Sequence, residues 1–241
     1  MIVMRKNILV MSNKGGVGKT TVAVNLAYAL MKDYKVGILD ADIHGPNVPK
    51  MLGIENEKPE AAEDKMLPIK IKNLYVMSVG FLTEESNQPI IWRGPLKTKL
   101  LRQFISDVKW PELDFLIVDL PPGTGDETIT VMQLLKENSF SVVVSTPQEV
   151  SKIDAEKAIE VSKKFGIPVI GLVENMSGEI FGSGKIEKFA KDNGINFLGR
   201  IELDKTITES SNNGKPFVLE NNKASEEFNK IVEKITDKLM R

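Results

Sequence analysis

The segment Ser12–Thr21 constrains the fold of this 241-residue chain more than any other. It reads S-N-K-G-G-V-G-K-T-T, follows a short apolar run at 8–11 and opens a pattern typical of a helix. Glycines in such a loop let the backbone turn tightly with its N–H groups directed inward, where they stabilise a phosphate. The strand, loop and helix pattern therefore predicts a phosphate-binding loop with a nucleoside triphosphate as its ligand.

The residues expected to hold the phosphates are consecutive in this loop. Lys19 would place its ammonium group at the β- and γ-phosphates, and the Thr20 hydroxyl would ligate Mg²⁺. The alternative is a glycine-rich turn that joins a strand to a helix and binds nothing. The expected nucleotide contacts come from Gly15, Gly16, Val17, Gly18, Lys19, Thr20 and Thr21.

One residue of the loop departs from the general pattern G-x-x-x-x-G-K-[ST], and a second is not required by it. Asn13 stands where that pattern has glycine, and asparagine tolerates left-handed backbone angles better than most residues. We therefore expect the loop to keep its conformation. Lys14 is a second lysine that the pattern does not require, and by itself it is also compatible with a solvated surface charge.

The composition limits which partners and which metal ion can be expected. The 32 basic and 33 acidic residues give a formal charge of −1, which offers no bulk attraction to nucleic acid or anionic lipid. The chain has no cysteine and a single histidine, His44, so we expect Mg²⁺ rather than a zinc site. No apolar run approaches the ~20 residues of a transmembrane helix, and the N-terminus lacks a secretory pattern. We expect a cytoplasmic protein with no membrane or nucleic-acid partner.

Short apolar runs alternate with longer helical patterns along the chain. Continuous apolar runs are typical of strands buried on both faces, as in a parallel sheet covered by helices. The runs predict an α/β class, a three-layer P-loop NTPase fold with a mainly parallel central sheet flanked by helices. We expect one domain over 1–241, with the charged piece 58–68 as an excursion from it. The apolar runs lie at 7–11, 35–39, 115–118, 141–145 and 169–173.

Two helical patterns carry apolar faces. The first, at 148–165, is predicted to pack on the sheet through Val150, Ile153, Ala158, Val161 and Phe165. The second is a C-terminal helix at about 224–240. Its outer face mixes acidic and basic side chains, which favours docking against the domain over binding a membrane surface. Its apolar face is formed by Ala224, Phe228, Ile231, Val232, Ile235 and Leu239.

Acidic loops follow two of the predicted strands, where open parallel sheets place their ligand sites. Asp119 ends one strand and is expected to hold Mg²⁺ or one of its waters. Asp40 and Asp42 follow the other strand. We assign Asp42 to orient the attacking water and Asp40 to support Mg²⁺, with the division between them left open. Gly123 is expected to present its backbone N–H to the γ-phosphate.

Four further segments carry a family resemblance. They are D-A-D-I-H-G-P-N-V-P at 40–49, W-R-G-P at 92–95, D-L-P-P-G-T-G-D at 119–126 and E-N-M-S at 174–177. Together they resemble the Mrp/ApbC family, ATPases that carry iron–sulfur clusters. The match runs from about residue 5 to 204. The loop K-G-G-V-G-K-T resembles the deviant Walker A motif of the wider MinD/ParA group.

This resemblance implies roles that the residues alone do not fix. It implies ATP binding, slow hydrolysis and a homodimer with nucleotide near the interface. It further implies that Lys14 reaches the partner subunit's nucleotide and that Asn175 contacts adenine. It also implies an iron–sulfur cluster as cargo and a client protein in iron–sulfur or related metallocofactor assembly.

The chain departs from the family after N-M-S, where the family usually has a C-x-x-C pair. Here Ser177 continues directly into G-E-I-F-G-S-G at 178–184, and Glu179 cannot replace soft thiolates. We therefore expect that the homodimer does not hold a cluster by the usual route. Two alternatives to an assembly ATPase stay open: a nucleotide-switched interaction module without a cluster, and a MinD/ParA-like positioning ATPase.

Overall fold

A computed structural model describes residues 5–83 and 94–240 of the chain. Trp92 and Arg93 of the W-R-G-P segment lie outside the described residues. The strands of the main sheet stand in the order β10-β9-β8-β1-β7-β2-β6-β5, and all pairs are parallel except β5 with β6. These strands are β1 (Lys6–Met11), β2 (Val36–Asp40), β5 (Ile69–Ile71), β6 (Leu74–Ser78), β7 (Phe115–Asp119), β8 (Ser139–Ser145), β9 (Val169–Ser177) and β10 (Phe197–Glu202).

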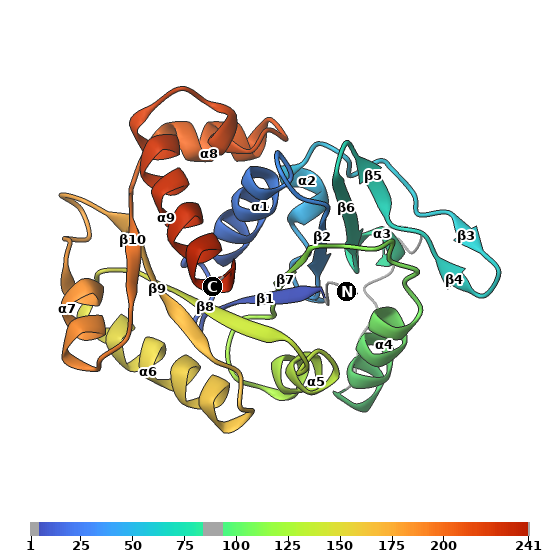
Figure 1. The fold of residues 1–241 in the computed structure, drawn as a ribbon, viewed down its shortest axis with the longest axis horizontal. Coiled ribbons are helices and arrows are strands. Elements are labelled where there is room, and N and C mark those ends of the chain that lie inside the picture. Colours follow the sequence, from blue (N-terminus) through green and yellow to red (C-terminus); the bar gives the residue numbers. More distant parts are fainter. Residues whose placement is uncertain (1–4, 84–93, 241) are drawn as a thin grey trace.

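Helices cover both faces of this sheet, so the predicted three-layer α/β architecture is confirmed (Figure 1). One layer holds α1 (Lys19–Leu30), α2 (Val48–Met51), α8 (Lys205–Asn212) and α9 (Lys223–Met240). The other holds α4 (Gly94–Ser106), α5 (Asp126–Leu134), α6 (Glu149–Lys164) and α7 (Lys185–Asp192). The short elements are α3 (Gly80–Thr83), the 3₁₀ turn η1 (Phe217–Leu219) and a hairpin of β3 (Ala61–Ala62) and β4 (Lys65–Met66).

The central strands are buried along their whole length, as their continuous apolar runs predict. Every residue of β2 and of β7 is buried, and so is every residue of β1 after Lys6. The sequence interpretation did not name β5, β6 or β10, which complete the sheet toward its two edges. The charged piece 58–68 contains the β3–β4 hairpin, which is mostly exposed.

Helix α6 packs on the sheet, but not through all of the predicted residues. Val150 and Ile153 are 63% and 55% exposed, so their assignment to the packed face is wrong. Small side chains allow the helix to approach the sheet closely, and they lie on another side of it. The buried residues of α6 are Ser151, Ala155, Ala158, Ile159 and Ser162.

Helix α9 docks with its apolar face inward. Phe228, Ile231, Ile235 and Leu239 are buried, and the rings of Phe228 and Phe217 meet edge to face at 5.3 Å. The helix approaches β10 so closely that a Cβ atom on Gly199 would lie 2.7 Å from the Ile231 side chain. Only glycine fits there without displacing the helix. Among the described residues, no helix is both long and apolar enough to cross a membrane.

Candidate active site

Three loops meet at the carboxyl edge of the sheet because β1, β7 and β2 are neighbours in it. The first joins β1 to α1, the second follows β2 at Asp40, and the third follows β7 at Asp119. They surround a cavity of about 280 Å³. Its lining comes from Ser12, Lys14, Gly15, Gly16, Gly18, Lys19, Thr20, Asp42, Asn47, Pro122 and Met176.

A buried ion pair stands at the base of this site. Lys19 Nζ donates to Asp119 Oδ1 at 2.6 Å, and the Thr20 hydroxyl donates to Asp119 Oδ2 at 2.7 Å. Lys19 is 6% exposed and Asp119 is 1% exposed, so the pair is screened from water. A hydroxyl and a carboxylate side by side form an oxygen donor set of the kind that Mg²⁺ prefers.

Two buried carboxylates at this base have raised proton affinities. Burial raises the pKa of Asp40 to about 8, and the charge of Asp119 adds to that increase. Burial also raises the pKa of Asp119, against the opposing effects of Lys19 and Thr20. The raised pKa values favour the protonated acids in the absence of a cation, whereas a bound cation would favour the carboxylates.

Asp40 is enclosed by hydrogen bonds rather than open to the cavity. Its Oδ2 accepts from the Ser78 hydroxyl at 2.8 Å and from the Val48 N–H at 3.2 Å, and its Oδ1 accepts from the Asp42 N–H at 3.2 Å. Asp42, in contrast, lines the cavity. Ser78 was missed because it ends β6, the strand that the apolar runs did not reveal.

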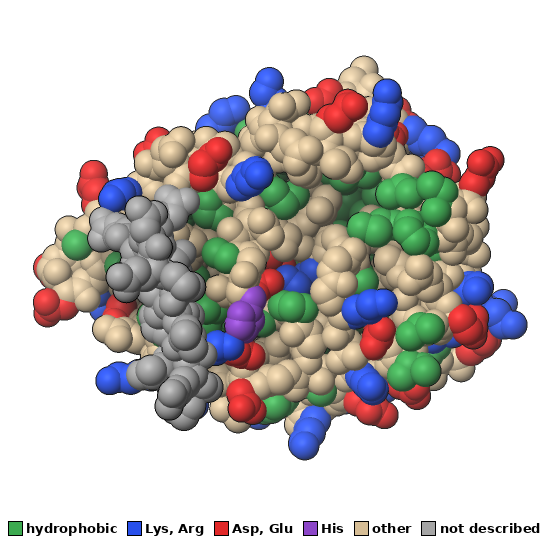
Figure 2. All heavy atoms as spheres, turned by 180° about the vertical axis from the view of Figure 1, so that it is seen from behind, with side chains coloured by type: hydrophobic (Ala, Val, Ile, Leu, Met, Phe, Trp, Pro, Cys, Tyr) green, Lys and Arg blue, Asp and Glu red, His purple; other side chains and the backbone are tan. Residues whose placement is uncertain are grey.

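Asp42 is fixed by the backbone that follows it. Its Oδ1 accepts from the His44 N–H at 3.1 Å and from the Gly45 N–H at 3.3 Å. His44 itself is largely exposed, and Figure 2 shows this single histidine on the surface of the face that it views. The carboxylate can therefore keep one orientation toward the cavity without a partner from another strand.

Asn175 bridges the loop to a second cavity. Its Nδ2 donates to the Val17 carbonyl at 2.8 Å, and a Cβ atom on Gly18 would lie 2.1 Å from that Nδ2. Gly18 has φ 84°, so glycine meets both a steric and a conformational demand here. The second cavity, about 200 Å³, is lined by Thr21, Asn175, Met176, Glu202, Leu203, Asp204, Ile207, Thr208, Ser211 and Asn212.

Met176 was not singled out from the sequence, although it lines both cavities. It has φ 58°, a left-handed conformation that is uncommon for a residue with a side chain. Strain of this kind is often found at ligand sites. A single sequence gives no signal for it, because methionine between two cavities reads as an ordinary core residue.

Asn13 keeps the loop in place by hydrogen bonds and not by a left-handed backbone. It does not have a positive φ, so that explanation for its presence is wrong. Its Nδ2 donates to Asp154 of α6 at 2.7 Å, and its Oδ1 accepts from the Thr124 hydroxyl at 3.4 Å. The amide therefore ties the loop to α6 and to the segment after β7. The neighbouring Lys14 is exposed.

The backbone N–H of Gly123, which we expected to face a phosphate, makes a hydrogen bond within the protein. Its backbone N–H donates to the Ser12 carbonyl at 2.9 Å, so this donor is occupied within the protein. A phosphate would receive it only after that hydrogen bond breaks. The bond closes the segment after β7 onto the start of the phosphate loop.

The segment 178–184, which follows Ser177 at the end of β9, forms a tight hairpin. Gly178 and Gly182 exchange both backbone hydrogen bonds, at 2.9 and 2.7 Å, and Ile180 at the tip is 77% exposed. The buried Glu174 accepts from the Gly184 and Ile186 N–H groups at 2.8 and 2.9 Å and so caps α7. This hairpin has no side chain suited to iron–sulfur ligation.

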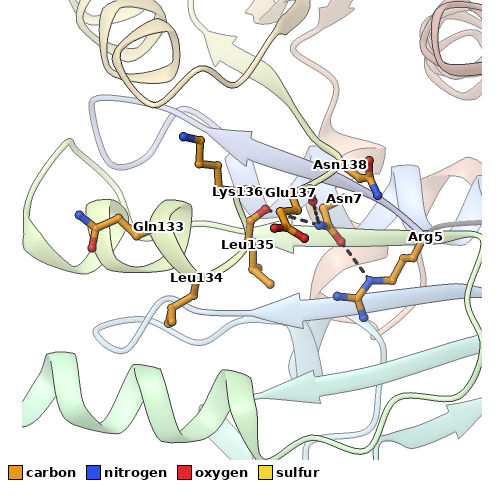
Figure 3. Close-up of a pocket in the computed structure, with 8 residues that line it drawn as sticks. All are labelled: Arg5, Asn7, Gln133, Leu134, Leu135, Lys136, Glu137 and Asn138. Atoms are coloured by element: carbon orange, nitrogen blue, oxygen red, sulfur yellow. Dashed lines mark hydrogen bonds between the residues drawn. The ribbon is translucent and has the colours of Figure 1, made fainter.

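A larger cavity, about 560 Å³, lies at the opposite, amino edge of the sheet (Figure 3). Asn7 and Arg5 line it together with 133–138. The Asn7 amide donates to the Glu137 carbonyl at 2.9 Å and to Ser139 Oγ at 3.2 Å, and its oxygen accepts from Arg5 Nε at 3.1 Å. These contacts hold the turn before β8, so the polar groups serve the fold.

The buried acids predict a pH-dependent stability in metal-free buffer. The pKa of Asp40 is raised to about 8, above the unfolded value of about 4, so its stabilising contribution is complete below pH ~4 and is lost as pH rises through about 8. The side chain of Asp40→Asn stays neutral. With EDTA present, the difference between the Tm of Asp40→Asn and the Tm of wild type should therefore increase from pH 6 to pH 9. The exposed Asp64→Asn is the control, and parallel curves for Asp40→Asn would contradict the assignment.

Comparison with known proteins places this geometry in a family. The family model described as ParA, NUBPL iron-transfer P-loop NTPase, matches residues 3–240. An iron-sulfur cluster carrier protein of Methanocaldococcus jannaschii is 50% identical, with 98% of this chain and 85% of the relative covered. A cytosolic Fe-S cluster assembly factor NUBP2 homolog of Nematostella vectensis is 43% identical, with 95% and 92% covered.

Solved structures share the fold. A nucleotide-binding protein of Archaeoglobus fulgidus in complex with ADP has a TM-score of 0.78 at 38% identity, with 92% of this chain and 91% of the other covered. The septum site-determining protein MinD of Pyrococcus horikoshii, complexed with Mg-ADP, has a TM-score of 0.79 at 25% identity, with 98% of each covered. The resemblance inferred from the motifs is confirmed, and the chain belongs to the ParA-type family of iron-transfer P-loop NTPases.

Proposed function

We propose that this chain binds and slowly hydrolyses Mg²⁺-ATP as a homodimer and uses that cycle in iron–sulfur assembly. The observation that carries the proposal is the convergence of Lys19, Thr20 and Asp119 beside the cavity that Asp42 lines. Phosphoryl transfer requires a cation at the phosphates, oxygen ligands for Mg²⁺ and a group that orients water. The proposed roles follow that division.

The phosphates would bind along residues 15–21, with Lys19 exchanging its contact with Asp119 for the β- and γ-phosphates. Thr20 and Asp119 would hold Mg²⁺ directly or through water, and Asp40 would act behind them, since its own oxygens are occupied by Ser78 and backbone donors. Asp42 would orient the attacking water. Gly123 would turn its N–H to the γ-phosphate after leaving Ser12.

Asn175 supports a preference for adenine. The bond to the Val17 carbonyl uses one of the two Nδ2 hydrogens and fixes the amide orientation, which leaves Oδ1 as an acceptor for a base. Oδ1 can accept from the 6-amino group of adenine, whereas the 6-oxo group of guanine is itself an acceptor. The adjoining cavity that Thr21 and Asp204 line has room for a base.

A cluster would be handled as cargo and not held by this chain's own thiolates. The relatives are named cluster carriers or assembly factors, but this chain has no cysteine. Iron–sulfur clusters are held chiefly by cysteine thiolates. We propose that the nucleotide state controls binding of a client protein or a small thiol-ligated cofactor that supplies the ligands.

Nucleotide binding tests the first part of the proposal. Calorimetry with Mg²⁺ should show tighter binding of ATP than of GTP. Lys19→Ala should weaken ATP binding about tenfold or more, since a hydrogen bond to a charged group contributes about 1.5–3 kcal/mol and 1.4 kcal/mol is tenfold. Lys109→Ala, remote from the cavity, is the matched control. Equal GTP affinity would remove the adenine assignment, and undiminished ATP binding in Lys19→Ala would remove the phosphate-loop assignment.

The role of Lys14 can be tested through turnover. If this exposed lysine enters the partner subunit's site, Lys14→Ala should lower kcat far more than ATP affinity, because a comparable arginine contributed in trans accelerates hydrolysis by about 10³–10⁵. Lys32→Ala, another exposed lysine, should behave as wild type. Specific activity should also rise with protein concentration. A monomer with constant specific activity would contradict the dimeric mechanism.

The cargo proposal predicts that the homodimer alone retains no stable [4Fe–4S] cluster. The protein would be incubated anaerobically with iron and sulfide, desalted, and assayed for iron, sulfide and visible absorbance. We expect background values, and retention only when a cysteine-bearing partner or a small thiol is added. Stoichiometric cluster in the homodimer without an added thiol would contradict the proposal.

A further inference from the structure

A charged cluster joins the Asp42 loop to two helices of one layer. His44 lies in the loop after β2, Lys97 in the first turn of α4 and Glu127 in the first turn of α5. Lys97 Nζ is 2.9 Å from His44 Nε2 and 3.2 Å from Glu127 Oε1, and His44 Nε2 is 3.5 Å from the same oxygen. Figure 2 shows an acidic and a basic side chain beside the purple histidine.

The pair at the centre of this cluster is shielded from solvent. Lys97 and Glu127 are 17% and 23% exposed, whereas His44 is 58% exposed. Partial burial acts to raise the pKa of Glu127, but the hydrogen bond and charge of Lys97, the backbone N–H of Glu127 and the nearby His44 outweigh it, so the pKa is lowered. A charge-assisted contact of this kind is stronger than one fully in water. It restrains the elements that carry the three side chains.

The restraint reaches the proposed water-orienting carboxylate through His44. The His44 N–H donates to Asp42 Oδ1 at 3.1 Å, while the imidazole of the same residue contacts Lys97 and Glu127. Helix α5 begins seven residues after Asp119, so Glu127 also belongs to the segment that starts at the proposed Mg²⁺ ligand. One carboxylate thereby connects the two acidic loops of the site.

We propose that Glu127 is a positioning residue for ATP hydrolysis. With Lys97 it holds the His44 side chain and so fixes the loop that presents Asp42 to the γ-phosphate. This inference rests on the proposed ATPase function and deepens it. Glu127 does not contact the phosphate cavity, so its loss should impair the chemical step and leave nucleotide binding largely intact. A misplacement of about 1 Å at a reacting group can cost about 100-fold in rate.

The experiment compares Glu127→Gln with wild type in single-turnover and steady-state ATPase assays. We expect kcat to fall about tenfold or more, in line with that cost, and the calorimetric Kd for Mg²⁺-ATP to stay within about twofold. Lys97→Met should give the same split. The double variant Lys97→Glu/Glu127→Lys restores opposite charges and should recover part of the lost kcat. Glu63→Gln, which breaks the exposed and remote Glu63–Lys109 pair, is the matched control and should change neither value.

A spectroscopic measurement separates positioning from a general loss of stability. Because the chain has one histidine, its imidazole NMR signals are unambiguous. They should shift in Glu127→Gln and Lys97→Met but not in Glu63→Gln, and Tm should stay close to wild type. Unchanged kcat in Glu127→Gln would overturn the inference. A fall in kcat matched by an equal loss of ATP affinity or by unfolding in both variants would also overturn it.

The Asp42→Asn variant separates a failure of the positioning role of Glu127 from a failure of the proposed ATPase mechanism. If Asp42→Asn hydrolyses ATP like wild type, the proposed role of Asp42 fails and the positioning role fails with it. If Asp42→Asn is inactive while Glu127→Gln is normal, only the positioning role fails. If both are slow and both bind ATP, the two proposals stand together.

Discussion

The site depends on one buried contact, the ion pair between Lys19 and Asp119. Each charge would be costly to bury alone, so the loop after β1 and the strand end of β7 stabilise each other. Thr20 and Asp40 join the same arrangement through a hydrogen bond and through charge. A triphosphate with Mg²⁺ offers both charges a substitute partner, which makes the pair a natural point of exchange between the protein and its ligand.

The sequence was most informative where a local pattern is compatible with only one local structure. The phosphate loop, the buried strands and α9 follow from glycine spacing and continuous or helical apolar runs. The sequence was misleading where spacing admits two solutions. Val150 and Ile153 have helical periodicity but are exposed, since small residues of α6 allow the closer approach. The contact between Glu127 and His44 joins segments far apart in the chain, so no local pattern reveals it.

Other features required knowing which polar groups are already occupied. Asn13 reads as a substitute for glycine, yet its amide works by reaching Asp154. Gly123 reads as a phosphate donor, yet Ser12 holds its N–H. In both cases the residue type indicated that the residue belongs to the nucleotide site. Only its hydrogen-bond partners showed which contact it makes there. The hydrogen-bond partners therefore show which groups of a motif are free to bind a ligand, which the spacing of its residues cannot show.

The place of β1 in the sheet sets the order in which this chain can fold during synthesis. β1 spans residues 6–11, but its neighbours on either side are β7 and β8, at 115–119 and 139–145. One edge of β1 stays unpaired until β7 is made, more than 100 residues later, and the other until β8 is made, and such edges favour aggregation. Rapid engagement by a chaperone on the ribosome would matter more for this topology than for one built from hairpins.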